Sequence, residues 1–154
     1  MTAHQFNKIA TYRSPAELRA RLKELNIDLP CDDEIQTTVG GSPLAVPIQI
    51  GDFQVGNRWC IHPMEGWDGN TDGTPSDKTF RRWRHFGESG AKLIWGGEAA
   101  AVQPSGRANP KQLLATPDHV TGLHQLLREL TTVHVEKFGA ADDLLVGLQL
   151  THSG

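Results

Sequence analysis

The residues best suited to chemistry gather where a short apolar run gives way to a polar loop. Residues 59–61 are apolar, and a histidine, a proline, a methionine, a glutamate and a tryptophan follow within residues 62–67. A short apolar run bounded by turn signals is typical of a strand that is buried on both faces. Pro63 lacks an N–H and cannot extend a central ladder, so strand pairing should stop there. We therefore predict that the backbone of residues 64–66 keeps unpaired polar groups that are free to hold a ligand.

Imidazole and carboxylate groups near the predicted strand ends offer an alternative chemistry, that of a metal centre. Nitrogen and oxygen donors of this kind bind zinc or iron. The sequence has no HxH, HExxH or CxxC spacing, and its two cysteines are far apart. Phosphate-binding loops of the GxxxxGKS/T and GxGxxG types and the GxSxG nucleophile motif do not occur either. A metal-dependent β/α-barrel enzyme stays open as an alternative, and its candidate ligands are His62, Glu65, Asp68 and His152.

Composition and charge exclude several classes of function. The 154 residues are 38% hydrophobic and 21% charged, which is typical of a globular chain. A formal net charge of −3 without a basic block gives no electrostatic support for binding nucleic acid or an anionic membrane. No stretch approaches the ~20 apolar residues of a membrane span. We expect a cytoplasmic protein with reduced thiols that acts on a small molecule.

The segments before the first strand are predicted to lie outside the catalytic part of the fold. Residues 1–40 should form an N-terminal arm and one helix, and residues 41–154 a β/α domain. Ser14 and Pro15 are strong start signals for the helix. Apolar pairs on either side of Gly51-Asp52 predict a β-hairpin that would close the bottom of a barrel. The apolar stripe of the helix is formed by Leu18, Leu22 and Leu25, and Glu17 is placed to complete a capping box.

Two helices and two further strands must position the end of the first strand. Ser76 is the cap of a predicted helix over residues 77–88, in which aromatic residues form the buried side. Arg81, Arg82 and Arg84 of this helix are expected to face solvent. The other predicted elements are a strand over residues 92–99, a helix that begins at Thr116 and ends at Gly139, and a strand over residues 144–150.

This alternation of strands and helices predicts a parallel sheet with right-handed crossovers. The connections from strand to helix are long and polar, whereas those from helix to strand, near residues 87–91 and 139–143, are tight. In β/α folds, ligands bind at the carboxyl ends of the strands. The unequal loops therefore indicate that the functional face lies at that end of the sheet.

Six short motifs follow one another along these predicted elements. Each is weak alone, but in this order they resemble the Old Yellow Enzyme family of NADH:flavin oxidoreductases, which are FMN-binding (β/α)8 TIM barrels. The resemblance starts at about Ile48, and residues 1–40 have no counterpart in the family. The motifs are Gly56-Asn57-Arg58, Pro63-Met64, Asp72-Gly73-Thr74-Pro75, residues 98–102, residues 104–107 and residues 149–154.

The resemblance implies an FMN site with NAD(P)H as the reductant. Backbone groups around Pro63, Met64 and Glu65 would line the isoalloxazine ring, and the backbone of Ala99 would lie near its pyrimidine end. The side-chain amide of Gln149, which offers two donors and one acceptor, would hydrogen-bond the N–C=O edge of the flavin. By resemblance, the reduced flavin would pass a hydride to an electron-poor alkene such as an α,β-unsaturated carbonyl.

Three residues depart from the family pattern. Glu65 stands where relatives carry a small polar residue or cysteine, and its charge would oppose an anionic reduced flavin. His62 replaces a small residue, and Trp67 stands where relatives often carry a tyrosine. Trp67 and His62 are the candidate catalytic residues on the substrate side, and the main catalytic residues are expected beyond Gly154.

The number of predicted strands also bears on function. A complete barrel needs roughly 250 residues, and the predicted elements reach only its third strand. We therefore expect the N-terminal portion of a barrel, inactive by itself. Its open sheet edges would favour self-association as a homo-oligomer. Because Glu65 and Trp67 occupy key positions, a non-catalytic binding protein derived from a barrel is the other alternative.

Overall fold

The computed structural model describes residues 7–39 and 41–153, and the chain divides into two compact units, Met1–Ser42 and Pro43–Gly154. In the first unit, the short helix η1 (Ile9–Thr11) precedes helix α1 (Pro15–Glu24). The rest of the predicted extended arm, residues 1–6, lies outside the described residues. Ser14 caps α1 as predicted, because its hydroxyl accepts a hydrogen bond from the Glu17 N–H at 3.2 Å.

Two details of α1 differ from the prediction. The Glu17 carboxylate accepts from the N–H of Arg13, at 2.8 Å, and not from that of the cap residue, so the predicted capping box is not formed. The helix contains no buried residue, so its leucine stripe does not build a core in this unit.

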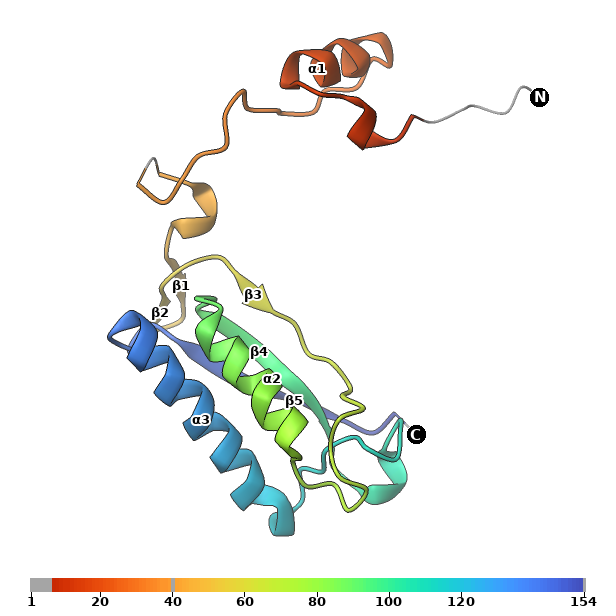
Figure 1. Ribbon diagram of the computed structural model, residues 1–154, viewed down its shortest axis with the longest axis vertical. Coiled ribbons are helices and arrows are strands. Elements are labelled where there is room, and N and C mark those ends of the chain that lie inside the picture. The colour runs from red at the N-terminus through yellow and green to blue at the C-terminus, as the bar shows by residue number, and fades with distance from the viewer. Residues whose placement is uncertain (1–6, 40, 154) are drawn as a thin grey trace, which may run out of the picture. The chain divides into compact units, whose positions relative to one another are not determined.

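The second unit is a mixed α/β structure built on two small sheets (Figure 1). An antiparallel hairpin comes first, with Ile48 paired to Val55 around the predicted turn. A three-stranded sheet follows in the order β3-β4-β5, and both of its pairings are parallel, as predicted. The part of the chain that the structure describes forms no closed barrel. The elements are η2 (Pro43–Ala45), β1 (Ile48–Ile50), β2 (Phe53–Val55), β3 (Cys60–Ile61), α2 (Asp77–Glu88), β4 (Leu93–Ala101), η3 (Pro104–Gly106), η4 (Pro117–His119), α3 (Val120–Phe138) and β5 (Leu145–Thr151).

Helices α2 and α3 lie side by side over one face of this sheet (Figure 1). The core between the two layers is apolar, and Gly87 allows the helices to approach closely. A Cβ on Gly87 would lie 2.3 Å from the carbonyl oxygen of Leu130 on α3. The buried core residues are Trp83, Ile94, Ala100, Leu113, Leu126 and Leu130. None of the helices in the described residues is long and apolar enough to cross a membrane.

The segment after the hairpin is hydrogen-bonded to the chain near the amino ends of β4 and β5. The N–H of Gly56 donates to the carbonyl of Asp143 at 3.1 Å. The Asn57 side chain donates to the carbonyl of Gly90 at 2.8 Å and accepts from the N–H of Lys92 at 3.2 Å. These contacts place the end of the hairpin at the edge of the sheet opposite the predicted ligand face.

The helix boundaries follow their end signals with one exception. Helix α2 spans the predicted residues, and Ser76 and Thr79 form a reciprocal capping box at its start. Helix α3 ends at Gly139, whose φ of 85° is the left-handed conformation that favours glycine. Its predicted start was wrong: the Thr116 hydroxyl bonds to the ring of His119 at 2.7 Å, and a 3-10 turn precedes the α-helix.

The first strand is shorter and less buried than predicted. Only Cys60 and Ile61 pair with β4, and both are partly exposed. Trp59, predicted to lie inside this strand, is 55% exposed. In the described residues β3 has a neighbour on one side only, and the prediction of a strand buried on both faces was therefore wrong.

Candidate active site at the strand ends

Three of the predicted cofactor-binding residues form a continuous row across the sheet. The carbonyl oxygen of Met64, just past the end of β3, accepts a hydrogen bond from the N–H of Ala99 on β4 at 3.0 Å. Ala99 is the register partner of Gln149 on β5. The structure thus brings Met64, Ala99 and Gln149 to the carboxyl-terminal part of the same three strands.

A β-bulge in β4 brings Pro63 into the same row. The register shifts between Trp95 and Ala99, and Gly96 within the bulge has a φ of 59°. A Cβ on Gly96 would lie 2.7 Å from the backbone nitrogen of Gln149 and 3.1 Å from the Cβ of Pro63. A glycine is therefore needed for these two segments to meet over β4.

The backbone groups expected to hold a ligand are mostly paired within the protein. Besides the Met64–Ala99 bond, the carbonyl of Ala99 accepts from the Gln112 amide at 2.7 Å. The N–H of Gly66 donates to Glu98 at 3.1 Å, and its carbonyl accepts from Asn109 at 3.1 Å. The prediction of unpaired backbone at residues 64–66 was thus wrong for Met64 O and for both polar groups of Gly66. Ala99 has no free backbone N–H to offer.

The side chains of the predicted site residues, in contrast, are mostly exposed and can contact a ligand. Gln149 is exposed, and its amide has no hydrogen-bond partner among residues 7–39 and 41–153. Met64 is 51% exposed and Trp67 68% exposed, and His62 is also exposed. Glu65 is half-buried. Gln149 thus offers an exposed amide on β5, whereas the Met64 thioether and the Trp67 ring are exposed on the segment after β3.

A buried ionic network supports the loop that carries these residues. Arg82 binds Asp68 through two parallel hydrogen bonds, both at 2.8 Å, and Glu98 through Nη2 at 2.6 Å. Its Nη1 donates to the carbonyl of Gly97 at 3.0 Å. The Glu98 carboxylate is fully buried and also lies 3.5 Å from the indole nitrogen of Trp83. The prediction that Arg82 faces solvent was wrong, since only 17% of its side chain is exposed.

Burial and pairing act in opposite directions on these charges. Burial raises the pKa of the Glu98 carboxyl, although Arg82 opposes this effect. Hydrogen bonds from Arg82 lower the pKa of the Asp68 carboxyl. Burial disfavours the charged guanidinium, but the bonds to both carboxylates raise the pKa of Arg82 overall. The bonds that Arg82 and the Gly66 N–H donate to Glu98 favour its charged form and oppose the effect of burial.

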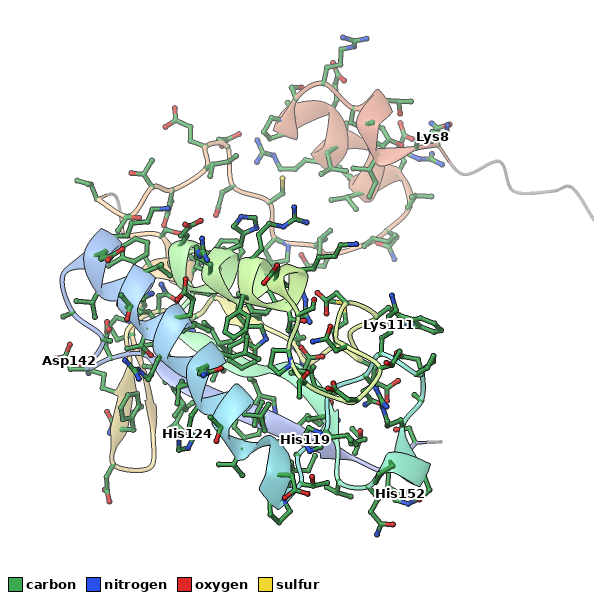
Figure 2. The ribbon with its side chains drawn as sticks, turned by 60° about the horizontal axis from the view of Figure 1, so that its bottom comes forward. Lys8, Lys111, His119, His124, Asp142 and His152 are labelled. Carbon is green, nitrogen blue, oxygen red and sulfur yellow. The ribbon has the colours of Figure 1, made fainter. Side chains whose placement is uncertain are left out.

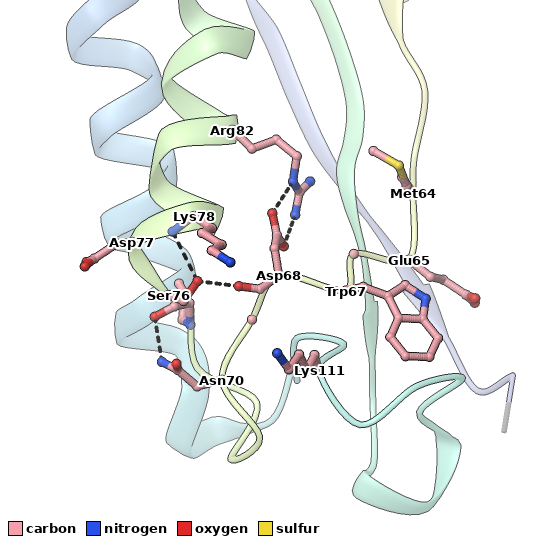
Figure 3. A pocket seen from close by; sticks show the side chains of 13 residues that line it. Met64, Glu65, Trp67, Asp68, Asn70, Ser76, Asp77, Lys78, Arg82 and Lys111 are labelled. Carbon is pink, nitrogen blue, oxygen red and sulfur yellow. Dashed lines mark hydrogen bonds and ion pairs between the residues drawn. The ribbon is translucent and has the colours of Figure 1, made fainter.

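A polar cleft of about 890 Å³ lies beside this network (Figure 3). It is lined by residues 64–70, the start of α2 at residues 75–78, Arg82 and Lys111. Neither Ala99 nor Gln149 lines this cleft. The cleft and the row across the strand ends are therefore different surfaces that share Met64. We place the candidate site at the strand ends, because the glycine bulge there brings the backbone of Gln149 next to Pro63.

The candidate metal ligands are not gathered. The Asp68 carboxylate is bound by Arg82, and His152 lies beside η3, where a Cβ on Gly106 would be 2.7 Å from its ring (Figure 2). In the described ranges, 7–39 and 41–153, no three His, Cys, Asp or Glu side chains are close enough to share a metal ion. The structure gives the metal-dependent alternative no support.

The roles of four residues that shape the site could hardly be predicted from the sequence. Glu98 lies inside an apolar strand, where a buried carboxylate requires a partner. Its position was therefore the only feature of the sequence that indicated a buried ion pair. Its partner Arg82 is 16 residues earlier in the chain. Asn109 and Gln112 come from the loop after β4, and no local pattern assigns their targets.

Comparison with known proteins supports the fold. No protein-family model and no curated protein matches the chain. Among solved structures, it is similar to the 2-naphthoyl-CoA reductase in a complex with 2-naphthoyl-CoA, with a TM-score of 0.57 and 21% sequence identity. The match covers 73% of this chain and 16% of that one, so this chain spans about a sixth of the reductase's length. At this identity the likeness shows the β/α fold alone, which is the fold of a segment of a reductase.

Proposed function

We propose that this chain contributes one wall of the FMN site of an oxidoreductase similar to the Old Yellow Enzyme family. The observation that carries the proposal is the row Met64–Ala99–Gln149, which ends in an exposed amide without a partner. In parallel β/α folds, ligands bind at this end of the sheet. The structural neighbour is a reductase, which agrees with this class of chemistry.

The residues present fit a flavin in part. Gln149 has the donor and acceptor needed to pair with an N–C=O edge, and without a ligand this amide pairs with no other residue that the structure describes. Gly96 lets the backbone of Gln149 and the ring of Pro63 approach each other closely, which brings two of the predicted cofactor-binding residues together. The backbone of Ala99 does not fit its predicted role, because both of its polar groups are bonded within the protein.

When bound, FMN would supply hydride transfer, here from NAD(P)H to an electron-poor alkene. In this proposal Gln149 binds the pyrimidine edge of the ring, and Met64 and Pro63 cover one side of it. Glu65 places a negative charge near the wall, which disfavours an anionic ring. Trp67 and His62 lie exposed on the same segment, where they would contact the substrate.

The test is reconstitution of the purified protein, in its full natural length, with FMN. We expect a visible flavin absorption band that remains with the protein after gel filtration. Replacement of Gln149 by leucine removes both polar groups of the amide and should weaken FMN binding about tenfold or more. Gln103→Leu, on an exposed loop after β4, is the matched control and should leave binding unchanged. Absence of the band from the wild-type protein would refute the proposal.

A further inference from the structure

Both backbone polar groups of Gly66 are bound by buried side chains. Its N–H donates to Oε1 of Glu98 at 3.1 Å, and its carbonyl accepts from Nδ2 of Asn109 at 3.1 Å. Glu98 is fully buried, and Asn109 is 5% exposed. A loop backbone would ordinarily be solvated, so these two buried partners fix the peptide units on both sides of the Gly66 Cα.

The identity of residue 66 agrees with this arrangement. A Cβ there would lie 2.7 Å from Nη2 of Arg82, 2.7 Å from Oε1 of Glu98 and 2.9 Å from Oδ1 of Asp68. Any side chain would push the ionic groups away from the loop. Glycine at this position thus allows the network to reach the backbone directly.

The partners of Glu98 and Asn109 are fixed in turn. The second oxygen of Glu98 accepts from Arg82, which is itself held by Asp68 and by the carbonyl of Gly97. The other end of the Asn109 amide accepts from the N–H of Lys111 at 2.9 Å. Because both side chains are bonded at both ends, neither can rotate without breaking a buried hydrogen bond.

We infer that Glu98 and Asn109 are positioning residues, which hold Gly66 so that the adjoining segment from Pro63 to Glu65 forms a rigid wall for the flavin. This inference rests on the proposed function. Only Glu65 separates Met64 from Gly66, so a shift of the Gly66 backbone moves the predicted wall as well. Figure 3 shows this short segment running from Met64 to Asp68, with Arg82 bound to Asp68.

Two isosteric substitutions test the two sides separately. Glu98→Gln keeps the volume, but its NH2 group must face either Arg82 or the Gly66 N–H, so a donor meets a donor in both orientations. Asn109→Asp places an oxygen against the Gly66 carbonyl and leaves the Arg82–Glu98 pair intact. Glu129→Gln is the control, because Glu129 pairs with Arg84 at 2.9 Å on the exposed side of the helices.

The experiment uses the natural full-length protein and combines two measurements. Hydrogen–deuterium exchange followed by mass spectrometry reports the opening of residues 62–70, and titration with FMN reports affinity and the position of the visible band. For Glu98→Gln and Asn109→Asp we expect about tenfold faster exchange in residues 62–70 with unchanged exchange in α3. We also expect FMN binding that is about tenfold weaker, with a shifted visible band. Glu129→Gln should match the wild type in both.

The outcomes separate this inference from the proposed function. Unchanged exchange in both variants would show that Gly66 is not held in this way. Faster exchange with unchanged FMN affinity and spectrum would show that the wall does not depend on Gly66. If Glu98→Gln speeds exchange throughout α2, α3 and β5, Glu98 stabilises the whole unit and not Gly66 in particular. Asn109→Asp, which leaves the ion pair intact, then shows whether the hold on Gly66 matters for FMN binding. A wild-type protein that does not bind FMN would overturn the proposed function, and this inference with it.

Discussion

Removing the charge of Arg82 should destabilise the protein far more than removing the charge of its neighbour on the same helix. Arg82 is 17% exposed and binds the fully buried carboxylate of Glu98. Arg82→Met keeps the apolar stem but leaves that carboxylate buried without its cation. Loss of one partner from a buried pair costs about 3–5 kcal/mol. Arg84 is 47% exposed in its pair with Glu129, so Arg84→Met should cost only about 0–1 kcal/mol.

A double substitution identifies the origin of the loss. In the Arg82→Met background, Glu98→Gln removes the unpaired buried charge and should recover about 1–3 kcal/mol of the free energy of unfolding. In the wild-type background, the same change should be destabilising, because Arg82 loses its partner.

Urea unfolding, followed by circular dichroism, measures all four proteins and the Arg84→Met control. Equal losses for Arg82→Met and Arg84→Met would refute this reasoning. They would show that Arg82 is solvated, as the sequence alone had predicted. A Glu98→Gln effect of the same sign and size in both backgrounds would show that the two side chains are not energetically coupled.

Three further predictions concern the layer of helices and its ends. Burial lowers the pKa of His134 below its ordinary 6.5, so as the pH falls the unfolded chain is protonated before the folded protein. The free energy of unfolding should therefore decrease below pH 6.5, by at most about 1.4 kcal/mol per pH unit. In urea titrations, His134→Gln should show a smaller decrease. A dependence on pH that is identical in the variant would contradict this. Gly87→Ala places a methyl group against Leu130 and should lower the free energy of unfolding by about 1–3 kcal/mol in the same assay. An unchanged urea midpoint would show that the two helices can move apart freely. Ser76→Ala removes the cap of α2 and should cost about 0.5–2 kcal/mol in the same assay. Ser76→Asp should recover only part of this stability, because a carboxylate can cap the helix but cannot donate to the carbonyl of Asp68 as the hydroxyl does.

Local signals were sufficient to predict helix α2, most of β4 and the end of α3. Ser76 and the glycines after residue 86 define α2, and the apolar run before Gly96 defines most of β4. Gly139 ends α3 because the chain turns there through a positive φ, which glycine adopts without steric cost. The order of these elements then implied a parallel sheet with its ligand face at the strand ends.

The contacts that shape the site could not be predicted, because their partners are distant in the chain. Arg82 lies among other arginines on a helix, and the pattern of charges there resembles that of a solvated face. Only the fold places it against Glu98, which comes from an apolar strand. The same holds for the loop amides of Asn109 and Gln112, which bond to backbone groups that were predicted to be free for a ligand.

The central claim is that one ligand contacts both the segment after β3 and the end of β5. The most direct test is hydrogen–deuterium exchange of the full-length protein with and without FMN. The claim predicts simultaneous protection of residues 62–66 and 147–151, with little change in α1. Protection limited to one of these segments, or to the cleft beside Lys78 and Lys111, would contradict it.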